Sequence, residues 1–340
     1  MPYGLKIDKK IKYLLVSLAA FLPFFACRAQ NVVYTTEAEI AHKALTESRL
    51  RSYVEFLSDS VCAGRATGTP GGNVATFWLV SRFQSCGLQP VGGSYVRHFT
   101  TETRKTGRNV IGLLPGSRPD ADYVILAAHY DGLGTLDGKM YPGADSNASG
   151  IAALFGISDM MRTLQELLGK KYRRNLLFVA LDGKNANLSG SRALWEDIVA
   201  GRLTDPVTGK AVTPDRISVF VNIDQAGSTL SPLHNDRPDF LIMLPGDRPM
   251  YGNYLTACNL RYDVGLDLGF DYYGSRDFTR LFYERISDQK VFLEHRIPAV
   301  MFTSGITLNN NKVHDTPDTL DYAVLRRRVW LIFHWLERIL

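Results

Sequence analysis

Five short runs of apolar and β-branched residues recur along the chain, and segments with helical spacing separate them. The runs are NVIGLLPG (109–116), YVILAAHYD (123–131), NLLFVALDG (175–183), ISVFVNIDQAG (217–227) and IPAVMFTSG (297–305). Each run is apolar almost throughout, as expected for strands that are buried on both faces. Such strands need helices on both sides of their sheet. This feature therefore predicts an α/β fold, a three-layer sandwich with a mainly parallel central sheet flanked by helices.

Segments in which apolar residues recur at helical spacing are predicted to form the outer layers of this sandwich. The predicted helices span 36–58, 73–87, 148–168, 191–201, 248–260 and 319–340, and GTPGG (68–72) is predicted to be a turn. The charged run RRR (326–328) is interpreted as a solvated face of the last helix. A chain of 340 residues that is 45% apolar can bury these elements in one large domain.

The first 29 residues have the pattern of a signal peptide. Basic residues precede the apolar run YLLVSLAAFLPFF (13–25), which is too short to span a bilayer, and small residues follow it. We therefore predict an exported protein, periplasmic or extracellular, with a signal peptide over 1–29, a domain over 30–340 and no membrane span. A lipoprotein acylated at Cys27 is the less favoured alternative, because the residues before it make a poor lipobox.

The net charge limits the classes of partner that the domain can bind, and the cysteine content limits the disulfides that it can form. The formal charge is +5. Residues 1–29 hold five basic residues and one acidic residue, a net +4, which leaves +1 for the rest. A nearly neutral domain gives no electrostatic argument for binding nucleic acid.

Cys62, Cys86 and Cys258 remain after cleavage. In an oxidising compartment Cys62 and Cys86 could pair, and three buried free thiols are the alternative.

Polar residues follow the predicted strands at the points where they end. They are His129 and Asp131 after one strand, Asp182, Lys184 and Asn185 after another, Asp224 after a third and His314 after a fourth. Ligands in open α/β sheets bind beyond the carboxyl ends of the strands. We therefore expect one cleft to gather His129, Asp145, Asp224, His314 and Lys184. Each residue also has an ordinary structural interpretation; Asp145 or Ser146, for example, could cap the helix that follows.

Ordered motifs along most of the predicted domain resemble peptidase family M28. These zinc exopeptidases include bacterial aminopeptidases and, as relatives, glutaminyl cyclases. The motifs are VEFLSDSVCAGRATGTPGG, GLQPVG, NVIGLLPGS, AAHYDGLG, PGADSNASGIAALF, NLSGSRAL, VNIDQAG, ISDQKVF, HRIPAVMFTSG and VHDTPDTLD. The resemblance implies two zinc ions that share a bridging aspartate, and a glutamate that serves as general base. His129, Asp224 and His314 match zinc ligands, and Asp131 matches the carboxylate that orients the first histidine.

The other positions of the implied zinc site differ from the family pattern. The bridging aspartate falls on Ser146, the general base on Lys184, a glutamate ligand on Asn185 and a loop histidine on Gln289. Catalytic zinc normally has about three protein ligands and a water molecule. The matched residues supply one carboxylate and two imidazoles for two ions. Zinc is thus expected from the family, but here we predict none, or at most one weakly bound ion. Glutaminyl-cyclase chemistry would need the same missing positions.

These departures predict an exported M28-like protein without ordinary dizinc aminopeptidase activity, and a peptide or protein ligand in the old cleft. The alternative is an active metallo-exopeptidase with a single or rearranged zinc site, whose base would be Asp145 or Asp182. We also expect the Lys184 ammonium to replace the charge of the metal by contacting Asp224 and Asp145. In the competing interpretation, Lys184 points to solvent.

Overall fold

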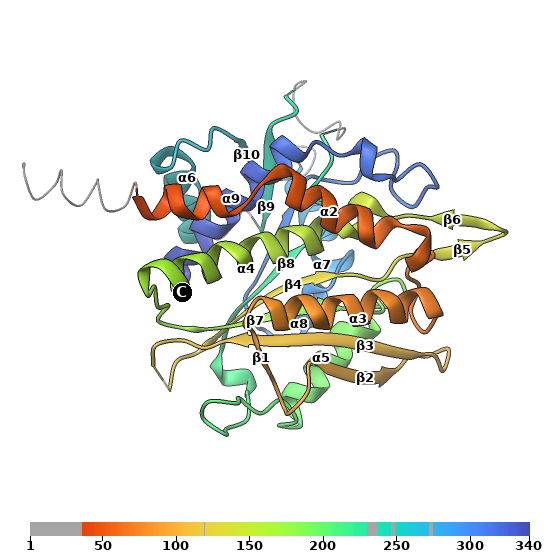
Figure 1. Cartoon of the computed structure of the whole chain (residues 1–340), viewed down its shortest axis with the longest axis horizontal. Helices are drawn as coiled ribbons and strands as arrows, with labels where there is room; N and C mark the ends of the chain where they lie inside the picture. Colours follow the sequence, from red (N-terminus) through yellow and green to blue (C-terminus); the bar gives the residue numbers. More distant parts are fainter. Residues whose placement is uncertain (1–35, 119, 230–236, 246–248, 272–274) are drawn as a thin grey trace, which may run out of the picture.

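The computed structural model describes residues 36–340, apart from 119, 230–236, 246–248 and 272–274. The predicted signal peptide and Cys27 lie outside the described residues. In the described part, a nine-stranded sheet has helices on both faces (Figure 1). The predicted fold class, a three-layer α/β sandwich, is confirmed.

The sheet is parallel at its centre, antiparallel where β1, β2 and β7 pair with β3 and where β9 pairs with β11, and it ends in the parallel pair of β9 and β10. Its order is β1-β3-β7-β4-β8-β11-β9-β10, with β2 paired to β3. The strands are β1 (Gln89–Pro90), β2 (Val96–Thr100), β3 (Thr106–Leu114), β4 (Tyr123–His129), β7 (Asn175–Leu181), β8 (Ile217–Ile223), β9 (Phe240–Leu244), β10 (Asp267–Gly269) and β11 (Ala299–Thr303). Four of the five predicted strands, β7, β4, β8 and β11, are parallel neighbours. The fifth, β3, pairs with β7 in the antiparallel direction. A separate hairpin joins β5 (Gly134–Leu136) to β6 (Lys139–Tyr141).

Successive residues of the central strands pack on opposite faces of the sheet. In β4, Leu126 packs into one core cluster and Ile125 into another, and every residue of this strand is buried. The first cluster lies under α2 (Glu47–Ser58), α3 (Pro70–Ser85), α4 (Ser149–Leu168), α6 (Pro249–Arg261) and α9 (Tyr322–Ile339). The opposite face is covered by α5 (Ser189–Val199), α7 (Arg276–Arg285) and α8 (Gln289–Glu294). Burial on both faces explains why these strands are apolar throughout.

Two helix starts differ from the sequence prediction. The predicted helix over 36–58 is broken at 45–46, because the Thr46 side chain caps α2 by accepting the N–H of Arg49. The segment 68–72, predicted to be a turn, contains the start of α3. Thr69 caps this helix and Pro70 takes its first position, where a missing N–H costs nothing.

The prediction of a solvated charge run at 326–328 is wrong for Arg328. This side chain is fully buried in α9, and its guanidinium donates to the carbonyl oxygens of Phe240, Ala226 and Ser228. The contacts tie the last helix to β9 and to the loop after β8. A buried guanidinium is tolerated here because carbonyl oxygens accept its hydrogen bonds.

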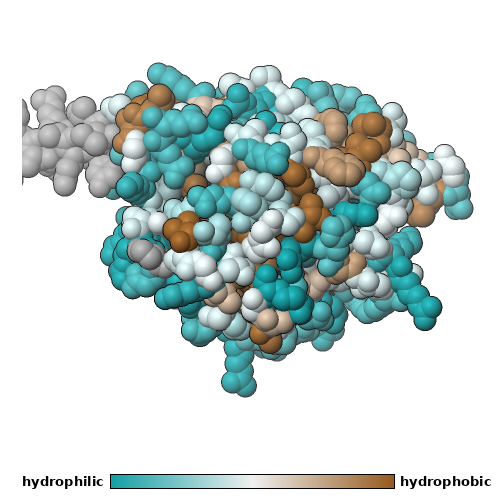
Figure 2. All heavy atoms as spheres, turned by 60° about the horizontal axis from the view of Figure 1, so that its bottom comes forward, coloured by the Kyte–Doolittle hydropathy of each residue, from teal (hydrophilic) through white to brown (hydrophobic). Residues whose placement is uncertain are grey.

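The three cysteines in the described residues are free and buried, so the possible bridge between Cys62 and Cys86 is not formed. Over the same residues, no helix is both long enough and apolar enough to cross a bilayer. On the face shown in Figure 2, apolar side chains occur in small groups among hydrophilic ones. Scattered apolar residues of this kind are usual on a protein surface.

Candidate functional site

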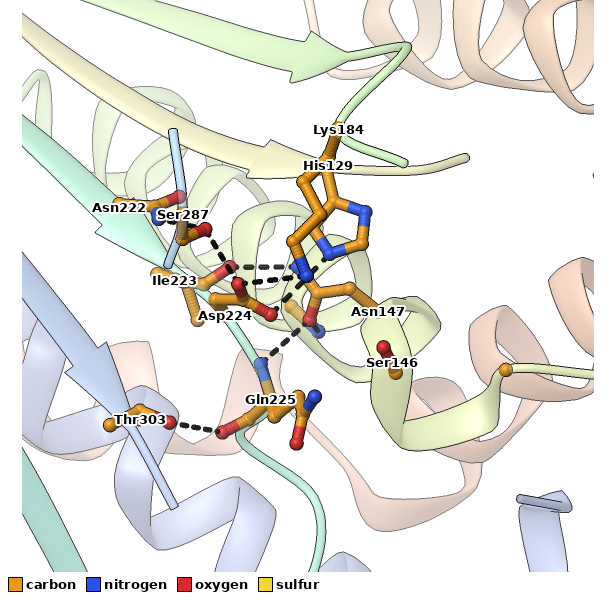
Figure 3. A network of polar contacts seen from close by, with 12 residues as sticks. His129, Ser146, Asn147, Lys184, Asn222, Ile223, Asp224, Gln225, Ser287 and Thr303 are labelled. Carbon is orange, nitrogen blue, oxygen red and sulfur yellow. Dashed lines mark hydrogen bonds and ion pairs between the residues drawn. The ribbon is translucent and has the colours of Figure 1, made fainter. Parts of the chain in front are cut away.

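His129, Lys184 and Asp224 meet at the carboxyl edge of the sheet (Figure 3). His129 ends β4, Lys184 follows β7 and Asp224 follows β8, so three neighbouring parallel strands deliver the three side chains. The Nε2 atom of His129 lies 3.4 Å from Oδ1 of Asp224, and the Nζ atom of Lys184 lies 3.7 Å from Oδ2. The prediction that His129, Asp224 and Lys184 share one edge of the sheet holds.

Asp131 lies on the other side of the His129 ring, where the resemblance placed an orienting carboxylate. The Nδ1 atom of His129 lies 3.1 Å from the Asp131 carbonyl oxygen and 3.4 Å from its carboxylate. The same carboxylate accepts the backbone N–H groups of Lys184 at 3.0 Å and Asn185 at 2.9 Å. It also accepts the Asn185 side-chain amide at 3.1 Å. Asp131 therefore fixes both the imidazole and the loop that holds Lys184.

A chain of buried hydrogen bonds supports Asp224 and includes Gln289. The Ser287 hydroxyl donates to Oδ2 of Asp224 at 2.6 Å, and the Asn222 amide donates to Ser287 at 3.0 Å. The same amide donates to Oε1 of Gln289 at 2.8 Å, and Gln289 donates to the Tyr283 carbonyl oxygen at 2.7 Å. Gln289 is completely buried. Its amide thus connects neighbouring elements beneath the site and does not face Asp224.

The charges of these groups stabilise one another. Burial lowers the pKa of His129 and the Lys184 ammonium lowers it further, but Asp224 and Asp131 outweigh both and raise it to about 9. Burial opposes ionisation of Asp224, yet Lys184 and His129 hold its pKa well below the usual range. Burial also lowers the pKa of Lys184, and the carboxylates of Asp224, Asp288 and Asp131 more than reverse this. The cluster therefore keeps its two cations and the Asp224 anion at neutral pH.

Asp288 is a charged residue of this site that the sequence interpretation missed. It is fully buried, and neither carboxylate oxygen has a hydrogen-bond partner among the described residues. Burial raises its pKa to about 6, although the His129 charge opposes the shift. The motif ISDQKVF contained the signal, because Asp288 directly precedes Gln289, the position of the expected histidine. Asp288 is therefore an acid of that motif that lies close enough to His129 and Lys184 to interact with their charges.

Asp145 and Ser146 belong to the turn that leads into α4. Both backbone N–H groups donate to the Asp315 carboxylate, at 2.7 and 3.0 Å. The Asp145 carboxylate accepts the Gly227 N–H at 2.8 Å and the Ser149 hydroxyl at 3.0 Å. Burial and the nearby Asp315 charge raise the Asp145 pKa to about 7. Asp145 is thus held within its own turn.

The expectation that Lys184 contacts Asp145 is wrong. Among the described residues, the ion pair of Lys184 is with Asp224, and the Asp145 carboxylate is held by Gly227 and Ser149. The side chain of His314 is exposed, whereas that of His129 is completely buried. The neighbouring Asp315 is the residue of that loop that turns inward. No hydrogen bond or ion pair within the described part joins His314 to the cluster.

Asp182, the other candidate base, has both carboxylate oxygens engaged. Oδ1 accepts the Thr67 hydroxyl at 2.7 Å and the Gly183 N–H at 2.8 Å, and Oδ2 accepts the Arg108 N–H at 2.9 Å. Burial raises its pKa to about 6. This carboxylate holds β3 and the loop after β7 together, so its environment is structural.

A second missed residue, Arg65, fixes the loops around the site. Its completely buried guanidinium donates to the carbonyl oxygens of Tyr130, Leu57, Pro142 and Gly143. Burial lowers its pKa. These bonds connect the end of α2, the segment after β4 and the turn before α4. The buried guanidinium of Arg65, with four accepting carbonyl oxygens, therefore helps to hold these segments together.

The space at the mouth of the site is small. Ser146, Asn185, Asn311, Lys312 and Asp315 are among the residues that line a cavity of about 10 Å³. This volume holds about one water molecule. Polar side chains from three separate segments thus converge on a narrow opening.

The donor atoms of the site meet the requirements of zinc only in part. His129 Nε2 and Asp224 Oδ1 both lack a hydrogen-bond partner and lie 3.4 Å apart. Two ligands of one tetrahedral zinc ion, with bonds of about 2.0–2.2 Å, lie at a similar separation. However, no group of three or more His, Cys, Asp or Glu side chains within the described ranges is placed to hold a metal ion. The residues present therefore do not fit a two-zinc centre.

The fold and the strand-end residues define the class of protein. The sequence matches the model of peptidase family M28 over residues 109–336, which is 228 of its 340 residues. The chain belongs to peptidase family M28.

Solved structures with the same fold include enzymes from several bacteria. The LapA aminopeptidase of Legionella pneumophila has a TM-score of 0.66 at 17% identity, over 89% of this chain and 73% of that one. BSAP, a zinc aminopeptidase from Bacillus subtilis, has a TM-score of 0.66 at 12% identity, over 86% and 95%. Glutaminyl cyclase from Porphyromonas gingivalis has a TM-score of 0.59 at 15% identity, over 87% and 99%. At these identities the likeness shows the fold alone.

A curated relative shares a shorter segment. The BOS complex subunit ncln of Danio rerio is 30% identical over 119 residues, which is 35% of this chain and 20% of that protein. The matched segment thus spans about a fifth of the length of that relative.

Proposed function

We propose that this protein is an exported member of peptidase family M28 that lacks ordinary dizinc aminopeptidase activity. The observation that supports this most is the ion pair between Lys184 and Asp224. The Nζ–Oδ2 distance is 3.7 Å, and the two side chains are only 17% and 4% exposed. A cation of the protein itself therefore stands beside a carboxylate that, in the family pattern, binds zinc.

Lys184 cannot supply the chemistry expected at its position. A general base must accept a proton from the attacking water, and a charged ammonium has no free electron pair to do so. The neighbouring carboxylates raise the pKa of Lys184 despite its burial, so the charged form is favoured. The Asn185 amide, at the glutamate ligand position, donates to Asp131. A positively charged Lys184 would also repel a zinc ion beside Asp224.

We propose that a peptide or protein ligand instead docks on the outer face of this opening, because the cavity of about 10 Å³ behind it has no room for a side chain. Polar side chains of Ser146, Asn185, Asn311 and Lys312 surround the opening at the carboxyl edge of the sheet, where open α/β proteins bind ligands. The relative from Danio rerio is a subunit of a complex, which supports a partner-binding role for this chain.

Binding can be tested with a fluorescein-labelled random decapeptide library, using fluorescence polarisation. Lys312 is exposed at the opening, so Lys312→Trp should block it and reduce binding. Lys139→Trp is the matched control, because Lys139 is exposed on β6 and does not line the opening. Equal binding by the parent and both variants would contradict a role for the cleft.

Loss of catalysis can be tested by restoring the family residues in steps. We expect Ser146→Asp alone to leave hydrolysis of leucine p-nitroanilide at background, because the general base is still missing and a base contributes about 10²–10⁴-fold. Adding Lys184→Glu and Asn185→Glu should restore zinc binding. Substantial zinc-dependent hydrolysis by the parent or by the single variant would refute the proposal.

An active single-metal exopeptidase is the second candidate. The unpaired His129 and Asp224 atoms, 3.4 Å apart, support it because they could be two ligands of one ion. This candidate predicts that the parent hydrolyses leucine p-nitroanilide, that a chelator stops the reaction and that His129→Ala abolishes it. Activity that is insensitive to the chelator would exclude the single-metal site.

Export by cleavage after Ala29 is also part of the proposal. N-terminal sequencing of the secreted protein should find Gln30 first. A protein that begins with a lipid-modified Cys27 would instead support the lipoprotein alternative.

A further inference from the structure

A second cavity, remote from the candidate site, lies among α2, α3 and α4. Its volume is about 570 Å³, and its lining includes Arg49, Arg82, Arg162 and the hydroxyl residues Ser48, Ser52 and Ser85. The helix α4 begins beside the strand-end cluster at Ser149. Arg162 lies 13 residues further on, roughly 20 Å along the helix. The cavity is therefore separate from the site described above.

The positive charge of this cavity is only partly neutralised by the protein. Asp159, which is 1% exposed, is the one acidic residue of the lining, and three arginines line the cavity with it, for a net charge of +2. Arg49 and Arg82 each approach a different oxygen of Asp159, and both distances are 3.5 Å. Strong charge-assisted hydrogen bonds are shorter, about 2.7–2.9 Å. Guanidinium donors therefore remain available for another acceptor.

Two further observations indicate unfilled donors. The Nε atoms of Arg82 and Arg162 are buried and have no hydrogen-bond partner among the described residues. The ion pair of Arg162 with Glu166 is long, 3.5 Å, and both side chains are well exposed, so it is weak and easily exchanged. A ligand with several negative oxygens could displace Glu166 and accept from the terminal N–H groups of Arg162.

The arginines are held in place before any ligand binds. The Tyr53 hydroxyl donates to Asp159 at 2.7 Å, and Arg82 donates to the Tyr53 hydroxyl oxygen at 2.6 Å. The Arg82 guanidinium also lies over the Tyr53 ring, 4.8 Å from its centre. Because these contacts fix Arg82, little conformational entropy is lost when an anion binds to it.

We propose that this cavity binds a phosphate or sulfate group, carried by a small hydroxylated molecule such as a sugar ester. The planar guanidinium group matches the oxygens of such anions, and three of them converge here. The cavity is much larger than a free phosphate ion. Its serine hydroxyls are suited to hydrogen bonding with the hydroxyl groups of a sugar. The proposal does not depend on the function proposed for the strand-end site.

The test is calorimetric titration of the full-length protein with glucose 6-phosphate, glucose 6-sulfate, inorganic phosphate and glucose. We expect the two esters to bind and glucose not to bind. Inorganic phosphate separates the two sources of the anion: weaker binding than the ester identifies a sugar ester as the ligand, and equal binding identifies the free ion. Failure of all three anions to bind, or binding of glucose as tight as that of its esters, would overturn the proposal.

Substitutions of the lining arginines test whether the anion binds in this cavity. Arg49→Gln and Arg162→Gln should each weaken ester binding by about tenfold, because each removes a charge-assisted hydrogen bond. Arg51→Gln is the matched control: Arg51 lies on the same helix, with 42% exposure against 46% for Arg49, and is not part of the lining. Circular dichroism should show that all three variants are folded. An equal loss of affinity in Arg51→Gln would mean that net charge alone attracts the anion, and would overturn the site.

Discussion

Replacing Lys184 by methionine tests whether its ammonium stabilises the folded protein. The substitution keeps an apolar stem and removes the charge that lies 3.7 Å from Asp224. At that distance, with an effective dielectric constant near 20, the attraction is about 4.5 kcal/mol. Loss of the burial penalty of the ammonium and the remaining His129 charge both offset this value. We expect the free energy of unfolding to fall by about 1–3 kcal/mol at pH 7.

The loss should depend on pH in a defined direction. In the parent, the folded-state pKa of Asp224 lies well below its unfolded value, and Lys184 is the main group that lowers it. Such a carboxylate contributes stability above the unfolded pKa, about 3.9, and loses it as the pH falls through the folded value. The variant lacks most of this contribution. The difference in stability between parent and variant should therefore grow as the pH rises from about 3 to 6 and then level off.

Urea unfolding of both proteins at a series of pH values measures this difference. Lys290→Met is the control, because Lys290 forms an ion pair of similar length with Glu294, 3.8 Å, at a more exposed place. Its loss should cost less than about 1 kcal/mol. A Lys184→Met protein as stable as the parent at pH 7, or a loss that does not change with pH, would refute the reasoning.

Two further substitutions test neighbouring parts of the site. The pKa of Asp145 is raised to about 7, so the parent loses stability as the pH rises from about 4 to 7. Asp145→Asn should remove this part of the loss. If urea unfolding of the variant showed the same dependence on pH as the parent, this reasoning would be contradicted. Gln289→His restores a family residue but breaks the buried amide contacts to Asn222 and Tyr283. It should lower the free energy of unfolding by about 1–3 kcal/mol, with Lys290→His as the surface control, and a stable, zinc-binding Gln289→His protein would show that the position still faces a metal site.

The sequence predicted the centre of the fold because burial on both faces excludes polar residues from a strand. β4 and β7 are buried at every position and could be located from that fact alone. β2 (VRHFT) is half exposed, and α8 has only six residues, so neither has a clear apolar period. The direction of β3 depends on its pairing with β7 across the sheet, which no local pattern encodes.

The site was predictable where strand ends determine it. His129, Lys184 and Asp224 come together because parallel neighbours end at the same edge. Arg65 was missed because only carbonyl oxygens bind it, and these come from three separate segments.

The loop before α9 is a second place where the sequence alone could not predict which residue turns inward. Asp315 turns inward to accept two backbone N–H groups of the turn before α4, which leaves the adjacent His314 exposed. The choice between these two neighbours is made by tertiary hydrogen bonds. The sequence pattern alone favoured the histidine.

The most direct test of the central claim is the zinc content of the purified protein. The protein would be incubated with excess zinc, dialysed and measured by inductively coupled plasma mass spectrometry. The triple variant with Ser146→Asp, Lys184→Glu and Asn185→Glu serves as a positive control. The parent should retain no zinc, or at most one weakly bound ion per chain, because Lys184 stands beside Asp224 and the bridging carboxylate is absent. Two zinc ions per parent chain would contradict the account.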